Sequence, residues 1–217
     1  MVLRSKLKLI SILFISFGSF SLAGAKNADW HEAIALAVLT SDTEKKARAC
    51  QVLAVVGGSE SVPALAALLN NERLASYART ALELIDDPSA GSALRSALPN
   101  LEGRLLAGAI TSLGVRGDKE TVSALQELTG NSDRSIAESA LVALARIGTE
   151  DSLATVVVAL NKGPAELRVA AAHAVLFKAE QFLKSGHVNQ SRKLAQAVAD
   201  VVFPDHILQA ASVMVAN

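Results

Sequence analysis

Residues 47–68, ARACQVLAVVGGSESVPALAAL, carry a pattern that returns three more times along the chain. With Leu53 as the reference position, an Ala stands four residues before it, a Gly four residues after it, and an Ala-Leu pair eleven and twelve residues after it. The next reference residues are Leu82, Leu113 and Leu144, at intervals of 29, 31 and 31 residues, with some substitutions at the other offsets. A fixed period in this range is typical of stacked structural repeats.

The composition favours helices. Of the 217 residues, 51% are apolar and only 4% are aromatic, and Ala and Leu, the two best helix formers, recur throughout. Segments with alternating β-branched residues, which would indicate strands, are missing. We therefore predict an all-α fold, a right-handed alpha-alpha superhelix of about five helical hairpins with terminal capping helices.

Each repeat is predicted to be a helix, a tight turn and a second helix. In the first repeat the helices are expected at about 44–56 and 61–69. Gly57-Gly58 should end the first helix, because glycine readily adopts the left-handed conformation. In the second repeat Asp87 is a good N-cap, and Pro88 suits the first helical position because its missing amide hydrogen costs little there.

The repeats divide the chain into four predicted regions. Residues 1–25 combine three basic residues, an apolar run and a small-residue ending, Ala23-Gly24-Ala25, which predicts a secretory signal peptide cut after Ala25. An uncleaved anchor is the alternative, although the run is shorter than the ~20 residues that span a membrane. Residues 26–41 are predicted to form an N-terminal capping helix, 42–163 four repeats, and 164–217 a diverged repeat with a C-terminal cap. Trp30 is expected to be a buried residue of the first cap, with a ligand-stacking role as the alternative.

The segment 57–65, GGSESVPAL, with the Ala, Leu and Gly positions before it, resembles HEAT repeats. The period of about 31 residues is similar to the short form named after phycobilisome lyase subunits. The resemblance covers roughly 42–179. It implies an interaction scaffold, since HEAT arrays serve mainly to bind other proteins, and it carries no catalytic motif.

No constellation for catalysis, a metal or a cofactor stands out, so we predict a protein that is not an enzyme and needs no cofactor. His173 is expected in the core or at a groove edge, and no histidine has a zinc-binding spacing. Cys50, the single cysteine, suits a core filler, with a reactive thiol as the alternative. The carboxylate pairs 86–87 and 150–151 stand where helices are expected to start, where negative charge is favourable without any catalytic role.

The charge is uneven. Without residues 1–25 the chain has 18 basic and 21 acidic residues, a net charge of −3, which argues against nucleic acid as a partner. Residues 162–193 nevertheless carry a net charge of +4. This basic end is either a solvated surface or a docking surface for an acidic partner or an anionic membrane.

Second helices usually line the concave, binding side of such an array. The outward positions there form our candidate protein-binding face: Ala64, Ala67, Asn71, Ala93, Ser96, Asn100, Ala124, Glu127, Asn131, Thr155, Val158 and Lys162. These residues are small and mostly polar, so a broad and modest contact is expected. We therefore predict an exported scaffold, periplasmic or secreted, that binds a protein partner of the cell envelope. The alternative is an accessory subunit or chaperone resembling chromophore lyase subunits, with a deep apolar pocket near His173.

Overall fold

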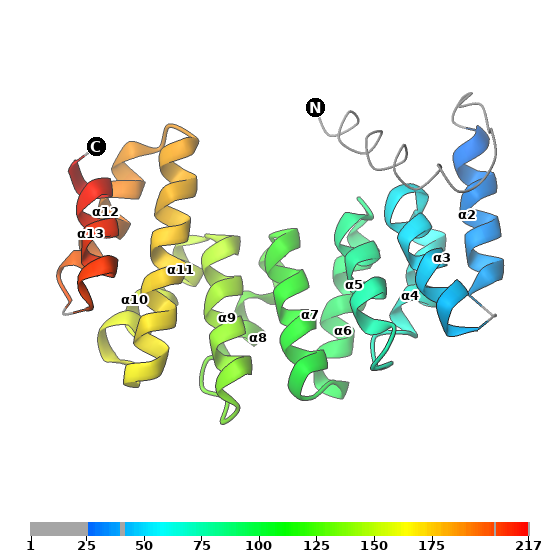
Figure 1. Ribbon diagram of the computed structural model, residues 1–217, viewed down its shortest axis with the longest axis horizontal. Coiled ribbons are helices and arrows are strands. Elements are labelled where there is room, and N and C mark those ends of the chain that lie inside the picture. Colours follow the sequence, from blue (N-terminus) through cyan, green and yellow to red (C-terminus); the bar gives the residue numbers. More distant parts are fainter. Residues whose placement is uncertain (1–25, 40–41, 202, 217) are drawn as a thin grey trace. The chain divides into compact units, whose positions relative to one another are not determined.

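The computed structural model describes residues 26–39, 42–201 and 203–216, and all regular structure within these ranges is helical (Figure 1). The predicted signal peptide, residues 1–25, lies outside them. The chain divides into two compact units, residues 1–101 and 102–217. Within the described ranges, no helix combines the length and apolar character needed to cross a membrane.

The first unit contains the capping helix and two helical hairpins. Its elements are α2 (Lys26–Val38), α3 (Thr43–Val56), the 3-10 turn η2 (Ser59–Ser61), α4 (Val62–Ala66), α5 (Ala75–Leu84), α6 (Pro88–Ala97) and η3 (Leu98–Asn100). The first helices α3 and α5 pack on each other, and the second helices α4 and α6 form another row beside them. This is the predicted hairpin arrangement.

The second unit continues the same plan. Its elements are α7 (Gly103–Arg116), η4 (Lys119–Thr121), α8 (Val122–Leu128), α9 (Arg134–Ile147), α10 (Glu150–Lys162), α11 (Ala165–Lys184), α12 (Val188–Ala199) and α13 (Asp205–Ala216). The first helices α7, α9 and α11 lie side by side, with α8 and α10 as the second row and α12 and α13 packed against α11 (Figure 1). The all-α solenoid predicted from the period is confirmed.

The repeat pattern corresponds to the core. The four reference leucines are completely buried, and so are the residues twelve positions after them, Leu65, Leu94, Leu125 and Val156. The alanines four positions before the leucines are buried as well. Their small side chains let neighbouring helices approach closely, while each leucine contributes about 1.5–3 kcal/mol by leaving water. Each hairpin therefore buries its apolar stripe against the next hairpin.

Helix starts follow the predicted capping chemistry. The side chain of Asp87 accepts a hydrogen bond from the Ser89 amide, and Pro88 occupies the first position of α6. Thr149 caps α10 by accepting from the Ser152 amide at 3.2 Å. These contacts satisfy amides that have no partner inside the helix.

Two local predictions were wrong. Gly57 ends α3 in an extended conformation, with φ −67°, whereas Gly117 and Gly148 adopt the left-handed conformation after α7 and α9. The expected second helix at 61–69 is the turn η2 followed by the short α4, which ends at Ala66. In contrast, the long helix expected from Ala165 to a break at 185–186 is confirmed as α11.

The capping helix α2 is tied to the first hairpin by one carboxylate. Glu32 Oε1 accepts hydrogen bonds from the backbone amide of Gly58, at 2.8 Å, and from Ser61 Oγ. The two donors lie on either side of η2, ahead of α4, where amides are unpaired and negative charge is favourable. The side chain of Trp30 lies outside the described part of α2, so its predicted burial stays a prediction.

Candidate protein-interaction surface

The structure places the twelve candidate residues on or just after the second helices, and none of them is buried. Seven are exposed: Ala67, Asn71, Ser96, Asn100, Glu127, Val158 and Lys162. The other five, Ala64, Ala93, Ala124, Asn131 and Thr155, are half-buried. In both units the second helices therefore present a row of small and polar side chains to solvent.

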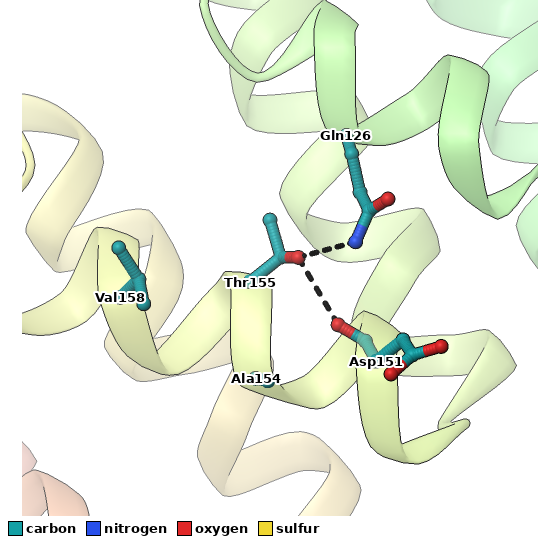
Figure 2. A pocket seen from close by; sticks show the side chains of 5 residues that line it. All are labelled: Gln126, Asp151, Ala154, Thr155 and Val158. Carbon is teal, nitrogen blue, oxygen red and sulfur yellow. Dashed lines mark hydrogen bonds between the residues drawn. The ribbon is translucent and has the colours of Figure 1, made fainter.

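A shallow pocket of about 390 Å³ lies between α8 and α10, within the second unit. Figure 2 shows the five residues that line it, Gln126, Asp151, Ala154, Thr155 and Val158. Gln126 Nε2 donates to Thr155 Oγ1 at 2.8 Å, and Thr155 Oγ1 donates to the Asp151 carbonyl oxygen at 3.0 Å. Since these polar groups already bond to one another, the pocket suits a small side chain of a protein partner.

Gln126 is the pocket residue that the sequence prediction missed. It follows the buried Leu125, between the core position and the outward position Glu127. A glutamine on this flank is long enough to reach the next second helix. The signal was therefore present in the sequence as a long amide side chain beside a core leucine.

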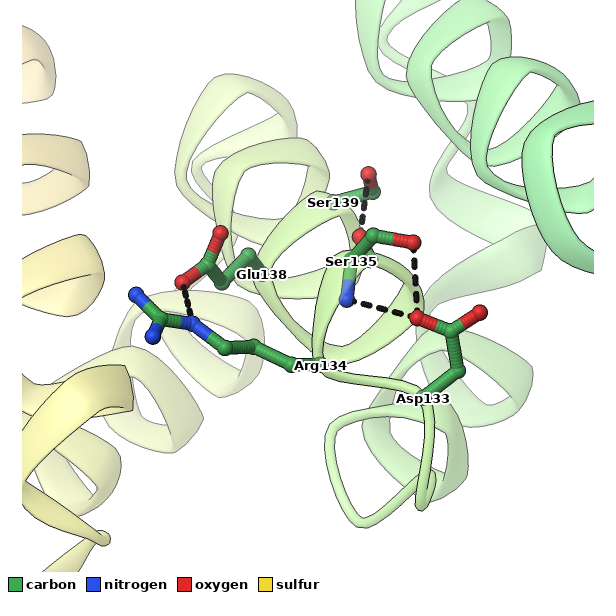
Figure 3. Close-up of polar contacts among 5 residues, drawn as sticks. All are labelled: Asp133, Arg134, Ser135, Glu138 and Ser139. Carbon is green, nitrogen blue, oxygen red and sulfur yellow. Dashed lines mark hydrogen bonds and ion pairs between the residues drawn. The ribbon is translucent and has the colours of Figure 1, made fainter.

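The polar residues at the start of α9 form a helix cap (Figure 3). Asp133 accepts hydrogen bonds from the Ser135 amide and hydroxyl, at 2.8 and 2.7 Å, and these bonds lower the pKa of its carboxyl. One turn later, Arg134 pairs with Glu138 at 2.6 Å. The cluster satisfies and stabilises the end of a helix, and its carboxylates are engaged in that role.

The histidines do not form a ligand site. His173 on α11 is exposed, so its expected place in the core or at a groove edge is not a core position. Its ring centroid lies 6.5 Å from that of His206 on α13. In the part of the chain that the structure describes, no group of three or more potential ligands could hold a metal ion.

Cys50 lies in the core of the first unit with no exposed surface. Burial raises the pKa of its thiol to about 11, because the thiolate would lose its hydration. The thiol is therefore neutral at physiological pH, and the interpretation of Cys50 as a core residue is favoured over a reactive thiol.

We expect the native protein to resist thiol modification. At pH 8, Cys50 should react with iodoacetamide at least about 10-fold more slowly than the same protein unfolded in guanidinium, because the thiolate is the reactive form and is absent from the core. Mass spectrometry of timed samples measures both rates. Equal rates in the native and unfolded protein would contradict a buried, neutral thiol.

Most of the basic end serves helix ends inside the second unit. Three of its side chains donate to carbonyls in the last turn of a helix: Lys178 to Arg146 in α9, Arg168 to Leu160 in α10, and Arg192 to Val215 in α13. Positive charge is favourable there because the carbonyls are unpaired and the helix dipole is negative. Lys184 pairs with Glu180. The structure thus favours an internal role for most of this charge over a docking surface.

Comparison with protein families matches residues 92–176 to the family described as HEAT repeats. A search of curated proteins finds no match. The matched segment runs from α6 to α11 and contains the reference leucines Leu113 and Leu144. The repeat period, the buried leucine positions and this match together support a HEAT-repeat protein.

Proposed function

We propose that the chain is an exported, non-enzymatic scaffold that binds another protein of the cell envelope through its second helices. The observation that carries the proposal is the row of twelve outward positions, all exposed or half-buried, in a fold of HEAT-repeat type. HEAT repeats generally mediate interactions between proteins. The surface is broad and nearly flat apart from the pocket between α8 and α10, which suits a protein surface better than a small molecule.

The binding face can be tested with bulky charged substitutions. We expect Ser96→Arg on α6 and Glu127→Arg on α8 each to weaken capture of the native partner about 10-fold or more, because both residues are exposed on the second helices. The measurement is pull-down from an envelope extract, followed by titration of the recovered partner. A partner that binds both variants as well as the original protein would contradict the proposed face.

Thr80→Arg is the matched control. Thr80 is exposed on α5, a first helix of the same unit as α6, so the substitution adds the same charge on the other row of helices. Capture should be unchanged in this variant. Circular dichroism of all three variants separates loss of binding from loss of helix.

Export is supported by the basic and apolar pattern of residues 1–25. Amino-terminal sequencing of protein recovered from the native envelope should begin at Lys26. A start at Met1 would favour a retained anchor instead.

The short phycobilisome-lyase form of the repeat supports a second candidate, an accessory subunit or chaperone for chromophore attachment. It rests on the segment 57–65 and the period of about 31 residues. The described pocket lies between α8 and α10 and is not lined by His173, where such a site was expected. A visible absorption band that purifies with the protein would favour this candidate.

A further inference from the structure

The first helices carry large exposed side chains at one repeat position. Two residues after the reference position stand Leu84, Val115, Arg146 and Phe177, spaced 31 residues apart. The three apolar members are exposed by 44%, 49% and 40%. By contrast, Val158 is the one large apolar residue with this much exposure on the second helices of the described chain. A repeated position that exposes apolar area marks an interaction surface more strongly than scattered residues do.

Within the second unit, three of these residues belong to neighbouring helices. Val115 is in the last turn of α7, Arg146 is in the last turn of α9, and Phe177 is on α11. The three helices pack side by side (Figure 1). The same repeat position therefore gives an apolar, a cationic and an apolar side chain in succession across the row.

Arg146 differs from Arg48 and Arg134 in the groups that its guanidinium contacts. Its guanidinium carbon lies 5.5 Å from the ring centroid of Phe177, and its Nε atom is buried without a hydrogen-bond partner. Arg48 and Arg134 pair with glutamates one turn away, but no carboxylate in the described part of the chain pairs with Arg146. Stacking on Phe177 holds the guanidinium in place while its donors remain available.

A stacked guanidinium with available donors is suited to a carboxylate, because two parallel N–H groups match the two carboxylate oxygens. Arginine and aromatic side chains are also the residues that most often dominate protein interfaces. An unpaired cation between two exposed apolar residues thus indicates a partner of complementary composition.

We infer that Val115, Arg146 and Phe177 form a second docking site, on the first helices, for a protein segment in which an acidic residue stands between two apolar ones. The carboxylate pairs with Arg146, and the apolar side chains cover Val115 and Phe177. Adjacent packed helices are about 8–10 Å apart, and an extended chain advances ~3.3 Å per residue. The apolar residues of the segment therefore stand about three positions before and after the acid.

The test is selection of random twelve-residue peptides, displayed on phage, against the immobilised full chain. Enriched peptides should carry Asp or Glu with large apolar residues about three positions away on each side. Synthetic copies of these peptides should bind the protein in fluorescence polarisation. Arg146→Gln and Phe177→Ser should each weaken this binding about 10-fold or more, whereas Val158→Ser, on the second helices, should leave it unchanged.

Charge reversal gives a readout that loss of structure cannot imitate. The Arg146→Glu protein should select peptides with Lys or Arg in place of the acid. The inference is overturned if no peptide is enriched, if enriched peptides lack an acid, or if Arg146→Gln binds them equally well. Binding to phosphatidylserine vesicles that depends on Arg146 would also overturn it in favour of a membrane surface. Peptide binding that is lost in Val158→Ser alone would refute this site while supporting the second-helix face.

Discussion

Replacing Leu144 with Ala is expected to lower the free energy of unfolding by about 2–5 kcal/mol. Leu144 lies at the reference position of α9 with no exposed surface, and α9 packs against α7, α8, α10 and α11. The substitution removes buried methyl groups and leaves a cavity that the surrounding helices can fill only in part. Because α9 contacts four neighbouring helices, we expect this loss to exceed that of any other substitution proposed for this protein.

Urea denaturation followed by circular dichroism measures this loss. Val158→Ala is the matched control, since Val158 lies in the same unit with 57% of its surface exposed, and its truncation should change stability by less than about 0.5 kcal/mol. A similar loss for the two variants would mean that Leu144 has no special place in the core.

Gly114→Ala is expected to lower the free energy of unfolding by about 1–3 kcal/mol, although Ala normally stabilises a helix relative to Gly by about 1 kcal/mol. Gly114 lies in α7 facing α9, and an added Cβ would stand 2.7 Å from the Cα and 2.8 Å from the Cβ of Ala143. Since a backbone atom cannot move aside as a flexible side chain can, α7 and α9 would have to separate. The same urea titration measures the effect.

Gly130→Ala is the control for this prediction. A Cβ at Gly130 would meet only the Glu127 carbonyl oxygen, at an ordinary 3.6 Å, and the backbone φ of Gly130 is not positive. This variant should be neutral or slightly more stable, because Ala restricts the unfolded chain. Gain of stability in Gly114→Ala as well would contradict the close approach of α7 and α9.

The fold was predictable because one pattern encodes both helix and core. Leu53 and its three equivalents repeat at nearly constant spacing, and each is fully buried. The details at helix ends were less predictable. Gly57 and Gly117 occupy the same repeat position, yet only Gly117 is left-handed. The choice between these conformations depends on the residues after the glycine, and α4 begins through a 3-10 turn that Glu32 of α2 holds from 26 residues away.

The candidate surface was predictable only in part. Positions such as Ser96 and Glu127 follow from helical periodicity, since residues opposite a buried stripe face solvent. The bond from Gln126 to Thr155 joins residues 29 apart, and periodicity does not say which partner a long side chain selects. The same limit applies to Lys178, whose charge suggested a docking surface but which caps α9.

Successive helical hairpins should pack on their neighbours and together present surface for a partner. The decisive measurement is hydrogen exchange followed by mass spectrometry, comparing Leu144→Ala with the original protein under native conditions. In a stacked array a defect is felt mainly by adjacent repeats. Exchange should therefore rise in α9 and in α7, α8, α10 and α11, while α3 and α5 keep their original rates. An equal rise in α3 and α5 would contradict a stack of hairpins, because it would show a single core shared by the whole chain.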